Sequence, residues 1–427
     1  MTEELFGRSE GLLKRLKKAS KFGTKFQVYP YQEAGRVVQE LTALAGTIPQ
    51  IESPQSKDDV IQAELKRRLN GEATILDHYL SGRPYDFDTV IAMYGIPRSD
   101  ITQLRKWLEG NRARTLDSID RLFQSTDVKN YELGLNVDVP NVRRQAEEFG
   151  AVQIQKYHKK LGRLLQDLSR VGEYLRDINA VPTTNERSYF NPLTTTLAIS
   201  VPAIVYSTED GSLHLREREL IKPYGHEGMG HALNHVVTHA NGLPYFLTRQ
   251  STLTEAAMES VSQFYQHVLF EDLKKSPETQ KELGIRHIFD EIYQEARDIT
   301  RLEEYRLRLF QYGISLLADK SMGDPHDPNV MRKKVELLSE VTLDPSFPLG
   351  FVEQNRYSFD SQRNLNPQLV SELRYAAQPV QRALEEFAQR DIKYDSKGRS
   401  KIDETLLKGF WTPIGFVDNA RISAQSK

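Results

Sequence analysis

The chain has 427 residues, of which 57 are Lys or Arg and 59 are Asp or Glu, so its net charge is −2. This near neutrality gives no overall electrostatic attraction to nucleic acid or to an anionic membrane. The chain has no cysteine, which excludes disulfides and cysteine nucleophiles and leaves His, Asp and Glu to bind any transition metal. Because no apolar run reaches about 18 residues and the N-terminus lacks a hydrophobic signal core, we expect a cytoplasmic protein without membrane or nucleic-acid partners.

Residues 1–185 are expected to form an N-terminal helical region. Apolar residues recur at intervals of three to four among many charges, which is the pattern of amphipathic helices packed in layers. The pattern is clearest in four segments: 61–69, 90–94, 101–122 and 152–175. Residues 11–21 are basic and amphipathic; a solvated helix face is favoured there over a membrane or nucleic-acid surface.

The composition changes near Pro182. Segments 194–201 and 203–207 are β-branched and apolar, as strands are, and 213–217 alternates like a returning strand after a turn at 208–212. This small sheet leads into a helix predicted over 225–239. We assign 186–275 to a core and 276–427 to a C-terminal helical region with a loop-rich stretch at 323–367.

The core contains the sequence His226-Glu-Gly-Met-Gly-His231. It differs by one residue from H-E-x-x-H, in which two histidines on one helix face bind zinc and the glutamate acts as general base. On a regular helix, with about 100° per residue, two histidines five residues apart point about 140° away from each other. They can bind one metal ion only if the helix is widened by a π-bulge. We therefore predict a bulge between Glu227 and His231, in a turn where Gly228 and Gly230 also indicate distortion.

A third ligand is expected on the next helix, because a catalytic zinc usually has three protein ligands. Glu255 lies 24 residues after His231 and is predicted to be that ligand. Glu259 lies one turn further on the same face, where its carboxylate can accept the free ring N–H of a ligating histidine. An alternative metal pair, His231 and His235 at i and i+4, would leave Glu227 away from the chemistry.

The stretch from His226 to Ser260 resembles the gluzincin metallopeptidases. In angiotensin-converting enzyme and the thimet oligopeptidase group, H-E-x-G-H precedes a helix that carries the glutamate ligand at a spacing close to 24. The first group also has a carboxylate four residues after that ligand, and oligopeptidases share the G-H-A-L found here at 230–233. Dipeptidyl peptidase III carries the longer H-E-x-x-G-H form, although its glutamate ligand lies further along the chain.

The resemblance implies a zinc-dependent metallopeptidase that hydrolyses peptide bonds with one zinc ion per chain. His226, His231 and Glu255 would bind the metal, Glu259 would support a ligand, and Glu227 would be the general base. It implies a mainly α (α+β) fold in which two helical regions flank a deep cleft, with the small sheet beside the metal helix. An edge strand from 194–207 would pair with the peptide substrate.

Gluzincins usually add a residue that stabilises the oxyanion, and Tyr357 is our candidate because it lies in a polar, loop-rich stretch. Candidate substrate-binding residues are Tyr312, Arg356, Arg363 and His235. For Tyr312, core packing is the favoured alternative.

Three other functions remain open from the sequence. The chain could be a zinc hydrolase of a non-peptide amide or ester, a catalytically inactive metal-binding scaffold, or a helical interaction protein without metal.

Overall fold

The structure is a computed structural model of a mainly helical protein with a small sheet. It describes the following residues: 2–19, 31–83, 85–96, 100–124, 140–168, 178–208, 210–324, 326–356, 364–365, 369–370, 373–395 and 398–426. Within these ranges, no helix has the length and apolar character needed to cross a membrane.

The α-helices and short helical segments follow one another along nearly the whole chain. In the N-terminal part they are α1 (Thr2–Ala19), α2 (Tyr31–Gly46), α3 (Lys57–Ser81), α4 (Phe87–Tyr94), α5 (Ile101–Gln124) and α7 (Pro140–Leu168). In the middle they are α8 (Val201–Ile204), α9 (Glu217–Pro223), η2 (Tyr224–Ala232), α10 (Leu233–Ala240), α11 (Tyr245–Thr248), α12 (Glu255–Lys274) and α13 (Pro277–Leu283). In the C-terminal part they are α14 (Phe289–Ala318), η3 (Lys320–Met322), α15 (Pro328–Ser339), α16 (Phe347–Arg356), η4 (Arg374–Ala377), α18 (Pro379–Ala388), α19 (Arg399–Leu406) and α20 (Pro413–Gln425).

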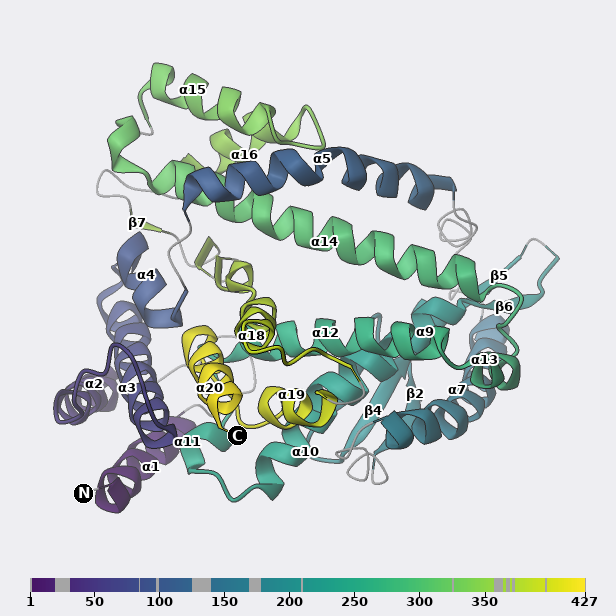
Figure 1. Ribbon diagram of the computed structural model, residues 1–427, viewed down its shortest axis with the longest axis horizontal. Coiled ribbons are helices and arrows are strands. Elements are labelled where there is room, and N and C mark those ends of the chain that lie inside the picture. The colour runs from purple at the N-terminus through teal and green to yellow at the C-terminus, as the bar shows by residue number, and fades with distance from the viewer. Residues whose placement is uncertain are drawn as a thin grey trace.

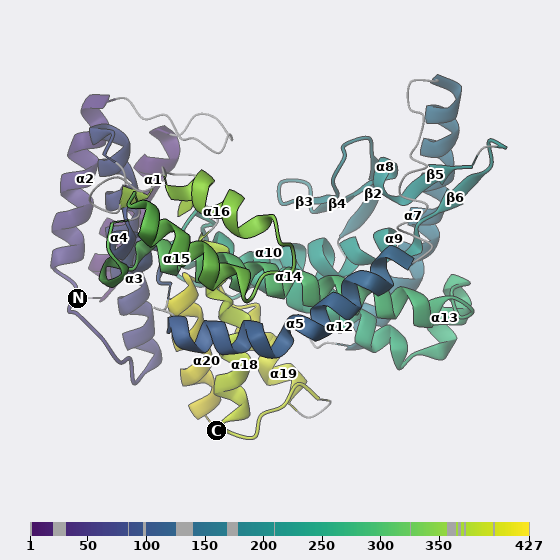
Figure 2. The same ribbon diagram turned by 90° about the horizontal axis from the view of Figure 1, so that it is seen from above.

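The helices α1–α3 lie at one end of the molecule, and the strands within residues 179–215 lie with α7 at the other (Figure 1). The long helices α12 and α14 run between these two ends, as the view from above also shows (Figure 2). The α18–α20 helices pack below α12, so α12 lies in the interior. The segment from His226 to His231 and the helix α12 are therefore central in the fold.

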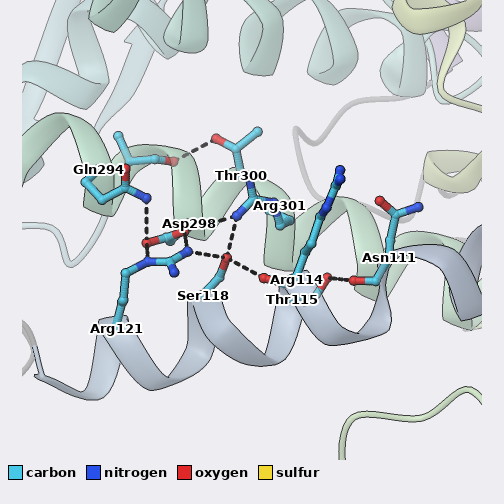
Figure 3. Close-up of polar contacts among 10 residues, drawn as sticks. Asn111, Arg114, Thr115, Ser118, Arg121, Gln294, Asp298, Thr300 and Arg301 are labelled. Atoms are coloured by element: carbon cyan, nitrogen blue, oxygen red, sulfur yellow. Dashed lines mark hydrogen bonds and ion pairs between the residues drawn. The ribbon is translucent and has the colours of Figure 1, made fainter.

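The helices α5 and α14 lie side by side and are joined by a polar cluster as well as by apolar packing (Figure 3). Arg121 donates two hydrogen bonds, of 2.7 and 2.8 Å, to the buried carboxylate of Asp298, which also accepts one from Gln294. Arg301 donates to Ser118 at 2.7 Å. Burial disfavours the charged form of Asp298, but these donors outweigh burial and lower its pKa.

In the part of the chain that the structure describes, the strands form three small sheets. Their bounds are β1 (Tyr85–Asp86), β2 (Asn179–Thr183), β3 (Tyr189–Asn191), β4 (Thr196–Ser200), β5 (Val205–Ser207), β6 (Leu213–Leu215) and β7 (Asn364–Leu365). The sheet near the motif has the order β2-β4-β3, in which β2 is parallel and β3 antiparallel to β4. The central strand is therefore β4, and β3 is an edge strand that lies against η2.

Buried charges on α3 hold the segments that precede α12 and α20. Arg68 is buried and donates to the carbonyl of Arg249 at 2.6 Å and to that of Phe410 at 3.3 Å. Glu64 accepts hydrogen bonds from both the backbone and the hydroxyl of Thr412, at 2.8 and 2.7 Å. Because buried polar groups need such partners, α3 fixes where the chain enters the glutamate helix.

The sequence predicted the helical character and the β5–β6 hairpin correctly, but it did not predict β2 and β3, and two further segments differ. Residues 201–204 form the short helix α8 instead of a strand, because Ser200 caps it and Pro202 occupies its first turn. The stretch 323–367, expected to be loop-rich, contains α15 and α16, whose apolar residues such as Leu338 and Phe351 pack into the core around α14. Prolines and glycines in this stretch interrupt the three-to-four residue spacing of apolar residues, so the sequence did not indicate these helices.

Candidate metal centre

The motif lies on a π-helix. Residues Tyr224–Ala232 form nine residues of π-helix between α9 and α10, and a π-helix bonds residue i to i+5. In a π-helix, two residues five positions apart therefore lie about one turn apart, with their side chains on the same face of the helix. The rings of His226 and His231 lie edge to face with 5.2 Å between their centroids. The predicted bulge is confirmed, and it extends further than a single turn.

Two glycines of η2 allow α12 to approach it closely. A Cβ atom on Gly225 would lie 2.6 Å from the Cα atom of Gln266, and one on Gly230 would lie 2.4 Å from the Cα atom of Ser262. No side chain fits at these distances without moving backbone. The contact at Ser262 places the preceding turn of α12, which carries Glu259, beside the two histidines.

His226, His231 and Glu259 form the candidate ligand set, with one ligand atom from each lying within 4.8 Å of the others. The Nε2 atoms of His226 and His231 lie 3.4 and 3.3 Å from the two carboxylate oxygens of Glu259. Two ligand atoms each about 2.1 Å from a tetrahedral zinc ion lie roughly 3.4 Å apart. The donor types and their separations therefore fit a zinc ion.

The structure does not group Glu255, the predicted third ligand, with the two histidines. Its carboxylate lies 2.8 Å from Nη2 of Arg374 and accepts a hydrogen bond from the Tyr375 hydroxyl at 3.0 Å. Glu259, which was expected to support a ligand, is the carboxylate that lies against both histidines instead. The physical reason is the register between η2 and α12, which the contact of Gly230 with Ser262 sets one turn later than the spacing suggested.

The electrostatics of the cluster favour a charged Glu259. Burial opposes its ionisation, yet the two imidazoles outweigh burial and hold its pKa well below the usual range. For His231, burial favours the neutral ring, but Glu259, Glu227 and Glu255 together raise its pKa. Such strong mutual shifts in a compact group are typical of functional sites, and a bound cation would replace the proton shared between them.

Glu227 points toward the edge strand. Its Oε2 atom accepts a hydrogen bond from the backbone N–H of Phe190 at 3.1 Å, which leaves the other carboxylate oxygen for proton transfer. Burial raises the pKa of Glu227, although the nearby His231 and His226 partly oppose the shift. A carboxyl whose pKa is raised toward neutrality is a better general base than an exposed one.

The strand nearest the motif is β3, which corrects the expected edge strand. Segment 194–207 supplies β4, which is paired on both sides, and β5, which belongs to a separate sheet. An interior strand has no free edge for a substrate. The unpaired edge beside Glu227 belongs to β3, whose Phe190 N–H points away from β4.

The other predicted site residues are dispersed. His235 packs against the ring of Phe190, with 5.9 Å between centroids, so it lies next to the edge strand. The prediction that Tyr312 binds substrate is wrong for this conformation, because that side chain is 1% exposed in the core around α14. Arg356 is half-buried on α16 and lies 3.0 Å from the Met331 sulfur. Tyr357 and Arg363 lie outside the described residues.

Sequence reasoning did not single out Arg374 and Tyr375, which contact Glu255, one turn of α12 before Glu259. They follow Glu255 by about 120 residues, and no motif or spacing connects them to it. The Phe190 backbone was missed for a different reason, since a backbone N–H carries no residue-type signal.

Comparison with known proteins returned no match: no protein-family model, no curated protein and no solved structure is similar to this chain.

The contact between η2 and α12 predicts a specific effect of Gly230→Ala. The added methyl group forces the helices apart, so we expect a loss of about 1–3 kcal/mol in the free energy of unfolding and weaker zinc binding. Denaturant titration and zinc titration measure the two effects. Gly228→Ala is the matched control in the same helix, because its Cβ would meet only ordinary contacts at 3.8 Å or more. Equal zinc affinity in both variants would contradict the role of the contact.

The ligand assignment predicts that Glu259→Gln and Glu255→Gln behave differently. Glu259→Gln removes a charged ligand, so it should abolish stoichiometric zinc after dialysis, whereas Glu255→Gln should retain one zinc per chain. Elemental analysis of the dialysed proteins distinguishes them. Loss of zinc in Glu255→Gln alone would restore the assignment based on spacing.

Proposed function

We propose that the protein is a zinc-dependent peptidase. The observation that carries the proposal is the cluster of His226, His231 and Glu259 with zinc-like separations, directly beside the carboxylate of Glu227. A bound zinc ion would supply Lewis-acid activation of a water molecule and of the scissile carbonyl. The remaining steps belong to side chains and backbone groups of the chain itself.

Glu227 is proposed to take the proton of the attacking water and to pass it to the leaving amine. The Phe190 N–H holds one of its carboxylate oxygens, which fixes the direction of the other. Its raised pKa helps it to keep the proton long enough to deliver it. Glu227 is placed close to the proposed metal site by the sequence itself, because it directly follows the proposed ligand His226 on the same helix.

The edge strand β3 supports a peptide as the substrate. In an antiparallel ladder the N–H and C=O of one residue point to the same side, so the Phe190 carbonyl faces outward together with the N–H that Glu227 accepts. An extended peptide could pair with that carbonyl and pass Glu227. A small amide or ester lacks the repeated backbone groups that such pairing uses, which makes the non-peptide hydrolase the second candidate.

Tyr375 is proposed to stabilise the oxyanion in place of Tyr357. Its hydroxyl contacts Glu255, which is one helical turn from the ligand Glu259, and Arg374 holds it in place with a hydrogen bond of 3.0 Å. Burial raises the pKa of Tyr375 to about 12, so the phenol remains protonated at neutral pH. Its single proton is donated to Glu255 in this structure and would turn to the oxyanion when substrate binds.

The proposed base is tested with Glu227→Gln. The amide cannot accept the proton of water, so we expect peptide hydrolysis to fall by about 10²–10⁴-fold while one zinc ion remains bound. Turnover of a peptide library, measured together with zinc stoichiometry, checks both parts. If Glu227→Gln keeps zinc and full activity, the mechanism is wrong; if the wild type binds zinc but hydrolyses no peptide, amide or ester, the protein is a metal-binding scaffold.

The role of Tyr375 predicts a loss in kcat. Tyr375→Phe removes only the hydroxyl, so kcat should fall by about 10²–10³-fold with little change in KM or zinc content. Tyr79→Phe, at an exposed tyrosine of α3, is the control and should behave as wild type. Unchanged kcat in Tyr375→Phe would remove this residue from the chemistry.

A further inference from the structure

A second pair of histidines lies in α10, the helix that continues directly from η2 beyond the proposed metal site. His235 and His239 are both in α10, four residues apart, where an α-helix places two side chains on one face. Their rings are close neighbours, with 4.2 Å between centroids and 41° between planes. Neither residue has a part in the proposed ligand set or in proton transfer.

The hydrogen bonding of His239 selects the form of the ring that binds metals. Its Nδ1 atom lies 2.8 Å from the carbonyl oxygen of His235. A carbonyl only accepts, so in the neutral ring the proton is on Nδ1 and the lone pair is on Nε2. Metal-ligating histidines typically donate their other ring N–H to such an oxygen, which fixes both tautomer and orientation.

The surroundings of His235 favour a neutral imidazole. The ring of Phe410 lies 6.4 Å from that of His235 and 6.5 Å from that of His239, and the ring of Phe190 lies 5.9 Å from that of His235. Burial, with a smaller contribution from His239, lowers the pKa of His235 to about 4. His235 is therefore uncharged at neutral pH and needs to lose no proton to bind a metal, while the exposed His239 is accessible from solvent.

We propose that His235 and His239 form a second divalent transition-metal site, which takes zinc through two imidazole nitrogens and completes its coordination with water. One ion about 2.0–2.1 Å from each Nε2 needs those nitrogens roughly 3–3.4 Å apart, which places the centroids of two rings aimed at it roughly 5 Å apart. The rings are 4.2 Å apart here, so binding requires the exposed His239 ring to turn away from that of His235. With two protein ligands instead of three and no carboxylate, this site binds zinc more weakly than the first.

The second site is separate from the first. A helix rises about 1.5 Å per residue. The midpoint between His235 and His239 therefore lies roughly 10–13 Å along the axis of η2 and α10 from the midpoint between His226 and His231. Two-metal centres place their ions about 3.5–4 Å apart, so the two ions would not share a ligand. An ion at the second site lies beside Phe190 and the outer edge of β3, where an extended substrate would pass.

Zinc titration by calorimetry, with elemental analysis at defined free zinc, tests the proposal. The wild type should bind one zinc ion tightly and a second at least tenfold more weakly. His239→Gln and His235→Gln should each lose the weaker class and keep the tight one, while Glu259→Gln should do the reverse. His287→Gln, at another exposed histidine, is the control and should keep both classes.

Saturation of the wild type by a single zinc ion would overturn the proposal, and so would an unchanged weaker class in His239→Gln. His239 is exposed, so this variant is decisive even if His235→Gln is poorly folded. One consequence rests on the proposed peptidase function: zinc above one equivalent should inhibit the wild type but not His239→Gln. Because the weaker class is measured by binding, its absence and the absence of peptidase activity are distinguishable.

Discussion

The close contact between the π-helix η2 and α12 is the constraint on which the proposed site depends. Gly225 and Gly230 bring the backbone of η2 against Gln266 and Ser262, at distances that exclude any side chain. The contact sets the register of the two helices and so decides which acidic residue of α12 meets the histidines. The π-helix has a complementary role, because it turns two histidines that are five residues apart toward the same point.

The two glutamates of α12 illustrate how position and charge divide the roles. Glu259 faces both imidazoles, which keep it ionised, whereas Glu255 is paired with Arg374 and Tyr375. A carboxylate already paired with a guanidinium is a poor candidate for a metal ligand, since binding would break that pair. Glu255 instead holds Tyr375 within one helical turn of the cluster, which connects η4 to the site.

The sequence was sufficient for the local features and insufficient for the long-range ones. The π-helix could be predicted because an i, i+5 histidine pair and two glycines are local signals. The position of Glu259 beside the two histidines could not be predicted, because a spacing along the chain does not report how two helices are packed against each other. For Arg374 and Tyr375 the limit is sharper, since about 120 residues separate them from Glu255 and only the folded chain brings them together. The edge strand was misplaced for the same reason: strand pairing order decides which strand is free.

The central claim is that one zinc ion is bound by His226, His231 and Glu259. Anomalous diffraction at the zinc absorption edge, from crystals grown with one equivalent of zinc, locates the ion without relying on activity. The account predicts one peak about 2.0–2.2 Å from the Nε2 atoms of both histidines and from a carboxylate oxygen of Glu259. A peak coordinated by Glu255, a peak at His235 and His239 alone, or no peak at all would contradict it.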